Sequence, residues 1–178
     1  SLAHTLYAWF GNLMELYASV PIEGVTSLCQ MVSEDVSYAF NLVYTEINQS
    51  NCASLSTATQ FFYVDPPTFL IVEDHAGLVI EKQLAWIDLF EAITWLVILF
   101  TIEVAVWLQD RNIGKGLIFK VLKATKLSLY SLLWTAVAYW IYRGHYMFAW
   151  DEFVWIAGFT AIEMNMVEWR KEINEAEV

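Results

Sequence analysis

The stretch AWIDLFEAITWLVILFTIEVAVWLQ, residues 85–109, decides the expected fold of this chain. It contains an uncharged segment from Ile93 to Ile102. As a helix rising 1.5 Å per residue, the whole stretch is long enough to cross a hydrocarbon layer of about 30 Å. Residues 117–142 and 146–169 are of similar length and similarly apolar, and short linkers join the three stretches. The sequence therefore predicts three antiparallel membrane-spanning helices.

Composition favours the same class. Of the 178 residues, 58% are hydrophobic and only 16% are charged, whereas roughly 25% are charged in typical soluble domains. A formal net charge of −11 argues against nucleic acid as a partner. We therefore expect an all-α integral membrane bundle in a lipid bilayer, with a homo-oligomer or other membrane subunits as its partners.

The distribution of charge predicts the orientation of the bundle. Residues 1–110 hold thirteen acidic residues and one basic residue, Lys82, whereas residues 111–126 hold five basic residues and no acid. An excess of Lys and Arg is typical of cytoplasmic loops. The segment from Arg111 to Lys126 and the C-terminus are therefore expected in the cytoplasm, and residues 23–84 outside it.

This topology divides the chain into four parts. Residues 1–22 include an apolar stretch, 5–20, that either forms a fourth span or lies as a helix at the outer interface. Residues 23–84 form an acidic extracytoplasmic segment, in which residues 33–47 look helical with Ser33 as the N-cap. Residues 85–169 form the three-helix membrane array, and residues 170–178 form a cytoplasmic tail.

The two cysteines, Cys29 and Cys52, both lie in the segment predicted to be outside. An oxidising compartment permits a disulfide between them, and such a bridge would stabilise its loop by very roughly 3 kcal/mol. Two unpaired, buried thiols are the alternative.

Depth along the predicted helices brings several charges to one level. Counted from the cytoplasmic ends, Glu103, Lys123 and Glu163 lie about 10–12 Å into the bundle. An isolated ion at that depth costs about 2.5–3.5 kcal/mol. We therefore expect Lys123, or Lys120 one turn away, to pair with Glu103 and Glu163. Lysines that extend to the headgroups beside lone or protonated acids are the alternative.

A second group of charges falls near the opposite helix ends. Carboxylates beside a histidine could capture a cation or relay protons, although a solvated rim of ordinary ion pairs is the simpler interpretation. The residues of this outer cluster are Asp88, Glu91, Arg143, His145, Asp151 and Glu152.

The chain carries no pattern typical of catalysis or of a cofactor site. The three histidines are scattered, no Glu-x-x-His pair is present, and neither a phosphate loop nor a nucleophile motif occurs. We expect no catalytic residues, no metal and no cofactor. The predicted function is a non-enzymatic integral membrane subunit that packs against itself or other membrane proteins. The alternative is an ion- or proton-coupled translocator that uses Glu103, Lys123 and Glu163.

Overall fold

A computed structural model describes the backbone of residues 2–64, 70–111 and 116–176, and most side chains between residues 6 and 165 of these ranges. The chain forms two compact units, Ser1–Ala92 and Ile93–Val178, which we call the sheet unit and the helical unit. Helix α3 (His75–Asp110) contributes residues to both. Each unit is described separately below.

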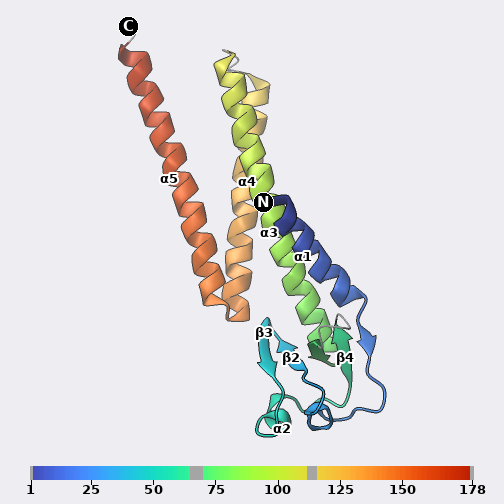
Figure 1. The fold of residues 1–178 in the computed structure, drawn as a ribbon. Coiled ribbons are helices and arrows are strands. Elements are labelled where there is room, and N and C mark those ends of the chain that lie inside the picture. The colour runs from blue at the N-terminus through green and yellow to red at the C-terminus, as the bar shows by residue number, and fades with distance from the viewer. Residues whose placement is uncertain (1, 65–69, 112–115, 177–178) are drawn as a thin grey trace. The chain divides into compact units, whose positions relative to one another are not determined.

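The sheet unit is built around five short strands in the order β1-β4-β5-β2-β3 (Figure 1). The pairing of β2 with β5 is parallel, and the other pairs are antiparallel. The all-α prediction is therefore wrong. The elements of this unit that precede α3 are α1 (Leu2–Tyr17), β1 (Val20–Pro21), η1 (Leu28–Met31), β2 (Ser37–Phe40), β3 (Val43–Glu46), α2 (Cys52–Leu55), β4 (Phe61–Val64) and β5 (Leu70–Glu73).

The predicted helix over residues 33–47 is a β-hairpin instead. Strands β2 and β3 are joined by Asn41 and Leu42, which both have positive φ, 53° and 58°. Two such residues match the twist of the flanking strands in a two-residue hairpin turn. The amide of Leu42 donates a hydrogen bond to Glu81 on α3 (3.3 Å), which helps to hold this residue in its unfavourable conformation. The β-branched and aromatic residues of the segment also favour strands.

Alternation along the strands gives the sheet two cores, because successive side chains point to opposite faces. Phe62 and Val72 pack with α1 and α3 on one face. Their neighbours Phe61 and Ile71 pack on the other face with η1 and α2. Helix α1 buries Leu13 and Leu16 in the first of these cores; it therefore covers a sheet and does not join a helical bundle as a fourth span.

The second face of the sheet is covered by short irregular segments that a disulfide holds together. Cys29 in η1 and Cys52 in α2 are bonded, with their Cα atoms 4.9 Å apart. Ser27 caps η1 with its side chain. Ser33, the predicted N-cap of a helix over residues 33–47, precedes the β2–β3 hairpin and begins no helix. Of the two states considered for the cysteines, the structure contains the bridge.

The helical unit consists of the second half of α3, α4 (Leu117–Arg143) and α5 (Tyr146–Ala176), with α4 and α5 forming an antiparallel hairpin (Figure 1). Gly144 ends α4 with φ 82° in the left-handed region that glycine tolerates. The amide of His145 closes the cap by donating to the carbonyl of Trp140 (2.8 Å). The side chains of the predicted tail, residues 170–178, lie outside the described part of the chain.

The prediction of a multi-pass membrane protein is wrong. Within the residues that the structure describes, one helix, over His75–Leu108, is long and apolar enough to cross a membrane, by length and composition alone. Helix α4 carries three lysines in its first ten residues, and such charges lower the mean hydropathy of a helix below that of a span. The predicted locations depended on the multi-pass topology and have no basis without it. These were the cytoplasm for Arg111–Lys126 and the C-terminus, and the extracytoplasmic side for residues 23–84.

Candidate functional site

The helical unit contains a groove of about 610 Å³ between its three helices, which we call the lysine groove. Most of its wall is apolar, and its charged side chains are two lysines and one glutamate. The lining residues are Thr101, Ile102, Ala105 and Val106 of α3, Phe119, Leu122, Lys123, Lys126, Leu127, Tyr130 and Trp134 of α4, and Ile156, Thr160 and Glu163 of α5.

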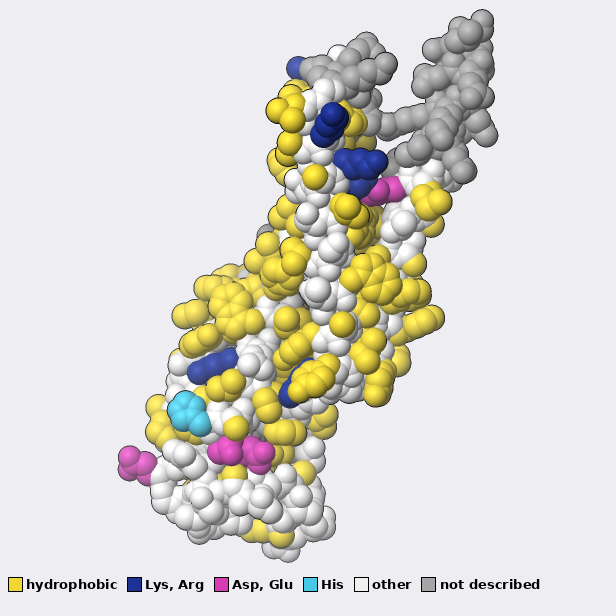
Figure 2. Space-filling view, turned by 180° about the vertical axis from the view of Figure 1, so that it is seen from behind, with side chains coloured by type: hydrophobic (Ala, Val, Ile, Leu, Met, Phe, Trp, Pro, Cys, Tyr) yellow, Lys and Arg dark blue, Asp and Glu magenta, His cyan; other side chains and the backbone are white. Residues whose placement is uncertain are grey.

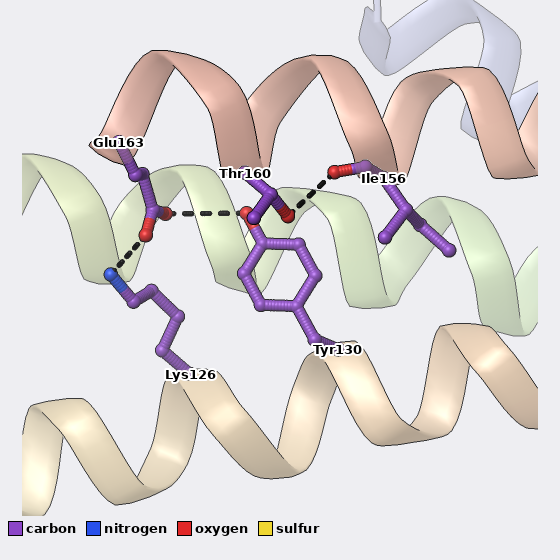
Figure 3. Close-up of polar contacts among 5 residues, drawn as sticks. All are labelled: Lys126, Tyr130, Ile156, Thr160 and Glu163. Atoms are coloured by element: carbon purple, nitrogen blue, oxygen red, sulfur yellow. Dashed lines mark hydrogen bonds and ion pairs between the residues drawn. The ribbon is translucent and has the colours of Figure 1, made fainter. Parts of the chain in front are cut away.

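Glu163 is held by two partners from α4 (Figure 3). Lys126 forms an ion pair with Oε2 of Glu163, and the hydroxyl of Tyr130 donates to Oε1 (3.2 Å). Burial, and then the neighbouring Glu163 carboxylate, raise the pKa of Tyr130, so its hydroxyl stays protonated and continues to donate. The carboxylate is thus neutralised and fixed in orientation, which leaves Lys123 as the amine of the groove without a paired acid in the described contacts.

The threonines of the groove present it with little hydrogen-bonding capacity. The hydroxyl of Thr101 donates to the carbonyl of Val97 (2.7 Å). The hydroxyl of Thr160 donates to the carbonyl of Ile156 (2.7 Å), as Figure 3 shows. Because each hydroxyl proton is satisfied within its own helix, neither threonine offers a hydrogen-bond donor to a ligand in the groove.

A buried carboxylate anchors α3 to the hairpin. Glu152 on α5 is only 7% exposed, and both of its oxygens accept from the indole Nε1 of Trp95 on α3 (2.9 and 3.2 Å). The Trp95 ring also lies 5.1 Å from the ring of Phe159. Burial raises the pKa of Glu152, the hydrogen bond from Trp95 lowers it, and Asp151 raises it. This contact fixes the position of α3 beside the groove.

Helix α5 has apolar residues on two opposite faces. Its inner face contributes the buried apolar residues Ala149 and Ile156, with the buried Glu152 between them. The exposed outer face of α5 carries apolar residues that are spaced alternately three and four positions apart. This is the spacing of a helix-packing seam. This outer seam of α5 consists of Met147, Trp150, Val154, Ala157, Ala161 and Met164.

Helix α4 has a matching seam of small residues on its outer face. Their spacing also alternates between three and four, and all are exposed. The hydroxyls of Ser128, Ser131 and Thr135 donate to carbonyls of the preceding turn (2.6–3.0 Å), so they need no outside acceptor. Hydrophobic side chains also cover much of the visible face of the helices in Figure 2. The outer seam of α4 consists of Val121, Ala124, Ser128, Ser131, Thr135, Ala138 and Tyr142.

The sheet unit has a smaller cavity of about 120 Å³, lined by three carboxylates and the aromatic rings of Trp9 and Tyr44. The carboxylates are Glu15 of α1 and Glu81 and Asp88 of α3. Burial raises the pKa of Asp88 to about 6. Within the described residues, no group of three or more His, Cys, Asp or Glu side chains is placed to hold a metal ion.

The predicted charge pairing differs from the observed one. The ion pair of Glu163 is with Lys126, one turn from Lys123, and Lys120 forms no ion pair with a described acid. Glu103 is exposed and does not line the lysine groove. Lys115 lies outside the described residues. The predicted depth of Lys123, which is counted from Lys115, is therefore not tested.

The six residues of the predicted outer cluster belong to different units. Asp88 and Glu91 lie in the sheet unit, and the other four lie in the helical unit. Asp151 is exposed, whereas Glu152 is buried against Trp95. The ring of His145 stacks on Phe148 at 5.3 Å and belongs to the aromatic packing around the α4–α5 turn.

The sequence contained a signal for the observed pair that the depth count missed. Lys126 is eighteen residues before Gly144 and Glu163 is nineteen after it, so the two meet in an antiparallel hairpin whose register is set by this turn. The same count places Tyr130, one turn further along, within reach of Glu163. Comparison with family models, with curated proteins and with solved structures finds no match for this chain.

Proposed function

We propose that the protein is a non-enzymatic assembly subunit that forms a homo-oligomer through the outer seams of α4 and α5. The observation that carries this proposal is the outer seam of α5. In a hairpin whose outer face met only water, these positions would be polar. Here, six successive seam positions are apolar and exposed.

The two outer seams are complementary in size. The α5 seam offers large side chains such as Met147, Trp150 and Met164, whereas the α4 seam is mainly Ala, Ser and Thr. Small residues let helix backbones approach closely, and large residues pack into the spaces that small ones leave. One chain thus carries both halves of a helix–helix interface, which favours a second copy of itself over an unrelated partner.

The translocator alternative has less support. It requires Glu103, Lys123 and Glu163 to act together, but Glu103 lies outside the lysine groove and Glu163 is paired with Lys126. The exposed apolar seam of α5, by contrast, needs a covering surface whatever other role the groove has.

The test compares two adjacent residues of α5. Val154 belongs to the outer seam and Trp155 does not, yet their exposed fractions are similar, 47% and 54%. The full chain is purified in a mild non-ionic detergent, and its mass is measured by light scattering and native mass spectrometry. Val154→Glu would bury an unpaired carboxylate in the interface, at a cost of about 3 kcal/mol, and we expect the oligomer to dissociate. Trp155→Glu should leave it assembled.

Two results would contradict the proposal. A wild-type chain that is monomeric at all accessible concentrations excludes the homo-oligomer. If Val154→Glu and Trp155→Glu reduce assembly equally, the seam residues have no specific role. The apolar surface is then covered non-specifically, as lipid would cover it. Circular dichroism of both variants controls for loss of helix.

A further inference from the structure

We infer that the lysine groove binds a single-chain fatty carboxylate, with the carboxylate at Lys123 and the acyl chain along the apolar wall. This inference does not depend on the proposed assembly, because the groove lies on the inner faces of the three helices and the seams lie on the outer faces. It rests on charge, on the chemistry of the wall and on dimensions.

Charge selects the head group. The groove is lined by two ammonium groups and one carboxylate. Lys126 and Glu163 neutralise each other, so one positive charge remains, on Lys123. A monoanion complements that charge, and the largely apolar wall beside the exposed Lys123 accommodates the rest of an amphiphile. A cationic amphiphile would instead place two like charges together.

The chemistry of the wall selects an acyl chain in preference to a polar ligand. Beyond the two lysines and Glu163, which is paired with Lys126 and Tyr130, the lining consists of aliphatic and aromatic side chains and the two threonines whose hydroxyls bond within their own helices. A polar ligand would lose hydrogen bonds to water there without replacing them. A hydrocarbon chain loses none and removes apolar surface from water.

Dimensions fit one chain. The volume of about 610 Å³ lies within the roughly 300–1,000 Å³ range of small-molecule sites. Along α4 the groove extends from Phe119 to Trp134, fifteen residues or about 22 Å. Lys123 is four residues from the first end and eleven from the second, so about 16 Å of wall remain for the tail on the Trp134 side.

The binding experiment uses the full chain in a non-ionic detergent, titrated with dodecanoate and with dodecyltrimethylammonium by calorimetry. We expect dodecanoate to bind at least ten-fold more tightly. Each pair of methylenes between octanoate and dodecanoate should tighten binding about fifteen-fold, the ratio that corresponds to ~0.8 kcal/mol per buried methylene. A photoactivatable fatty acid should label peptides of the groove, and dodecanoate should compete with it.

Matched variants locate the head group. Lys123→Gln should weaken dodecanoate binding about ten-fold, whereas Lys120→Gln, which removes the same charge one turn away and outside the groove, should leave it unchanged. Ala105→Phe should fill the groove and abolish labelling while circular dichroism shows intact helices. The inference is overturned by absence of binding, by equal affinity for the cationic and anionic amphiphiles, or by equal effects of Lys120→Gln and Lys123→Gln.

Discussion

Replacing Asp88 by asparagine should stabilise the sheet unit near neutral pH and remove part of its pH dependence. Asp88 lies on α3 and lines the small cavity that also contains Glu15 and Glu81. Burial raises the pKa of this carboxyl from 3.8 to about 6. Between these values the folded protein binds the proton more tightly than the unfolded chain does. The stability that this group contributes is therefore full below about pH 4 and is lost as the pH rises through about 6.

The size of the effect follows from the shift. About two pKa units, at 1.36 kcal/mol each, give an upper value of about 3 kcal/mol. Asp88 is partly exposed, and solvent screening reduces this to about 2 kcal/mol. Asparagine is close in shape and has no charge, so Asp88→Asn should be about 2 kcal/mol more stable than the wild type at pH 7, with little difference at pH 4.

Hydrogen exchange measures this effect in the sheet unit alone. The amides of β4 and β5 are followed by mass spectrometry between about pH 4 and pH 8, with correction for intrinsic exchange rates, and opening free energies are compared. Glu23→Gln, an exposed change in the same unit, is the control for removing one negative charge. An Asp88→Asn protein that keeps the wild-type pH slope, or is less stable at pH 7, would refute the reasoning.

Three further outcomes are expected. Cys52→Ser removes the bond to Cys29, which closes a loop of 23 residues, and should cost the sheet unit about 3 kcal/mol in denaturant unfolding; an unchanged midpoint contradicts this. Lys126→Gln and Glu163→Gln, singly and together, should give a coupling energy of about 1 kcal/mol that falls with added salt, and a value of zero would show that the pair contributes nothing. A Cβ atom added at Gly144 would have no atom within 4 Å, so only the positive φ of this position disfavours Gly144→Ala. The variant should lower helical-unit stability by about 1 kcal/mol in thermal unfolding, and a stabilised variant would be inconsistent with that account.

The helices of the second unit could be predicted from the sequence, but the sheet could not. Residues 117–142 and 146–169 were expected to be helical, and α4 and α5 cover them, because long, mainly apolar runs on either side of Gly144 have few other solutions. The strands are only two to four residues long, too short for a period of two to stand out. The turn at Asn41 and Leu42 also lacks the glycine that usually marks such a hairpin.

Length and apolar content likewise misled the assignment of class. They suggested several membrane spans, yet the same residues serve here in helix–helix packing and in the outer seams. For Glu163, a pairing with Lys123 or Lys120 was expected, but the lysine that pairs with it is Lys126. The depth count began at the far helix ends, whereas the turn at Gly144 sets the register. Contacts such as Trp95 with Glu152 depend on how α3 lies against the hairpin, which no local pattern encodes.

Three hydroxyls of α4 donate to carbonyls of their own helix, and this affects when α4 can fold during translation. Ser128, Ser131 and Thr135 are weak helix formers, and serine or threonine hydroxyls that bond to the preceding turn slightly destabilise a helix. These positions weaken α4 as an isolated helix, and its main partner among the described elements is α5. We expect α4 to be only partly helical on the ribosome until α5 has left the exit tunnel. The hairpin would then form as one unit late in translation.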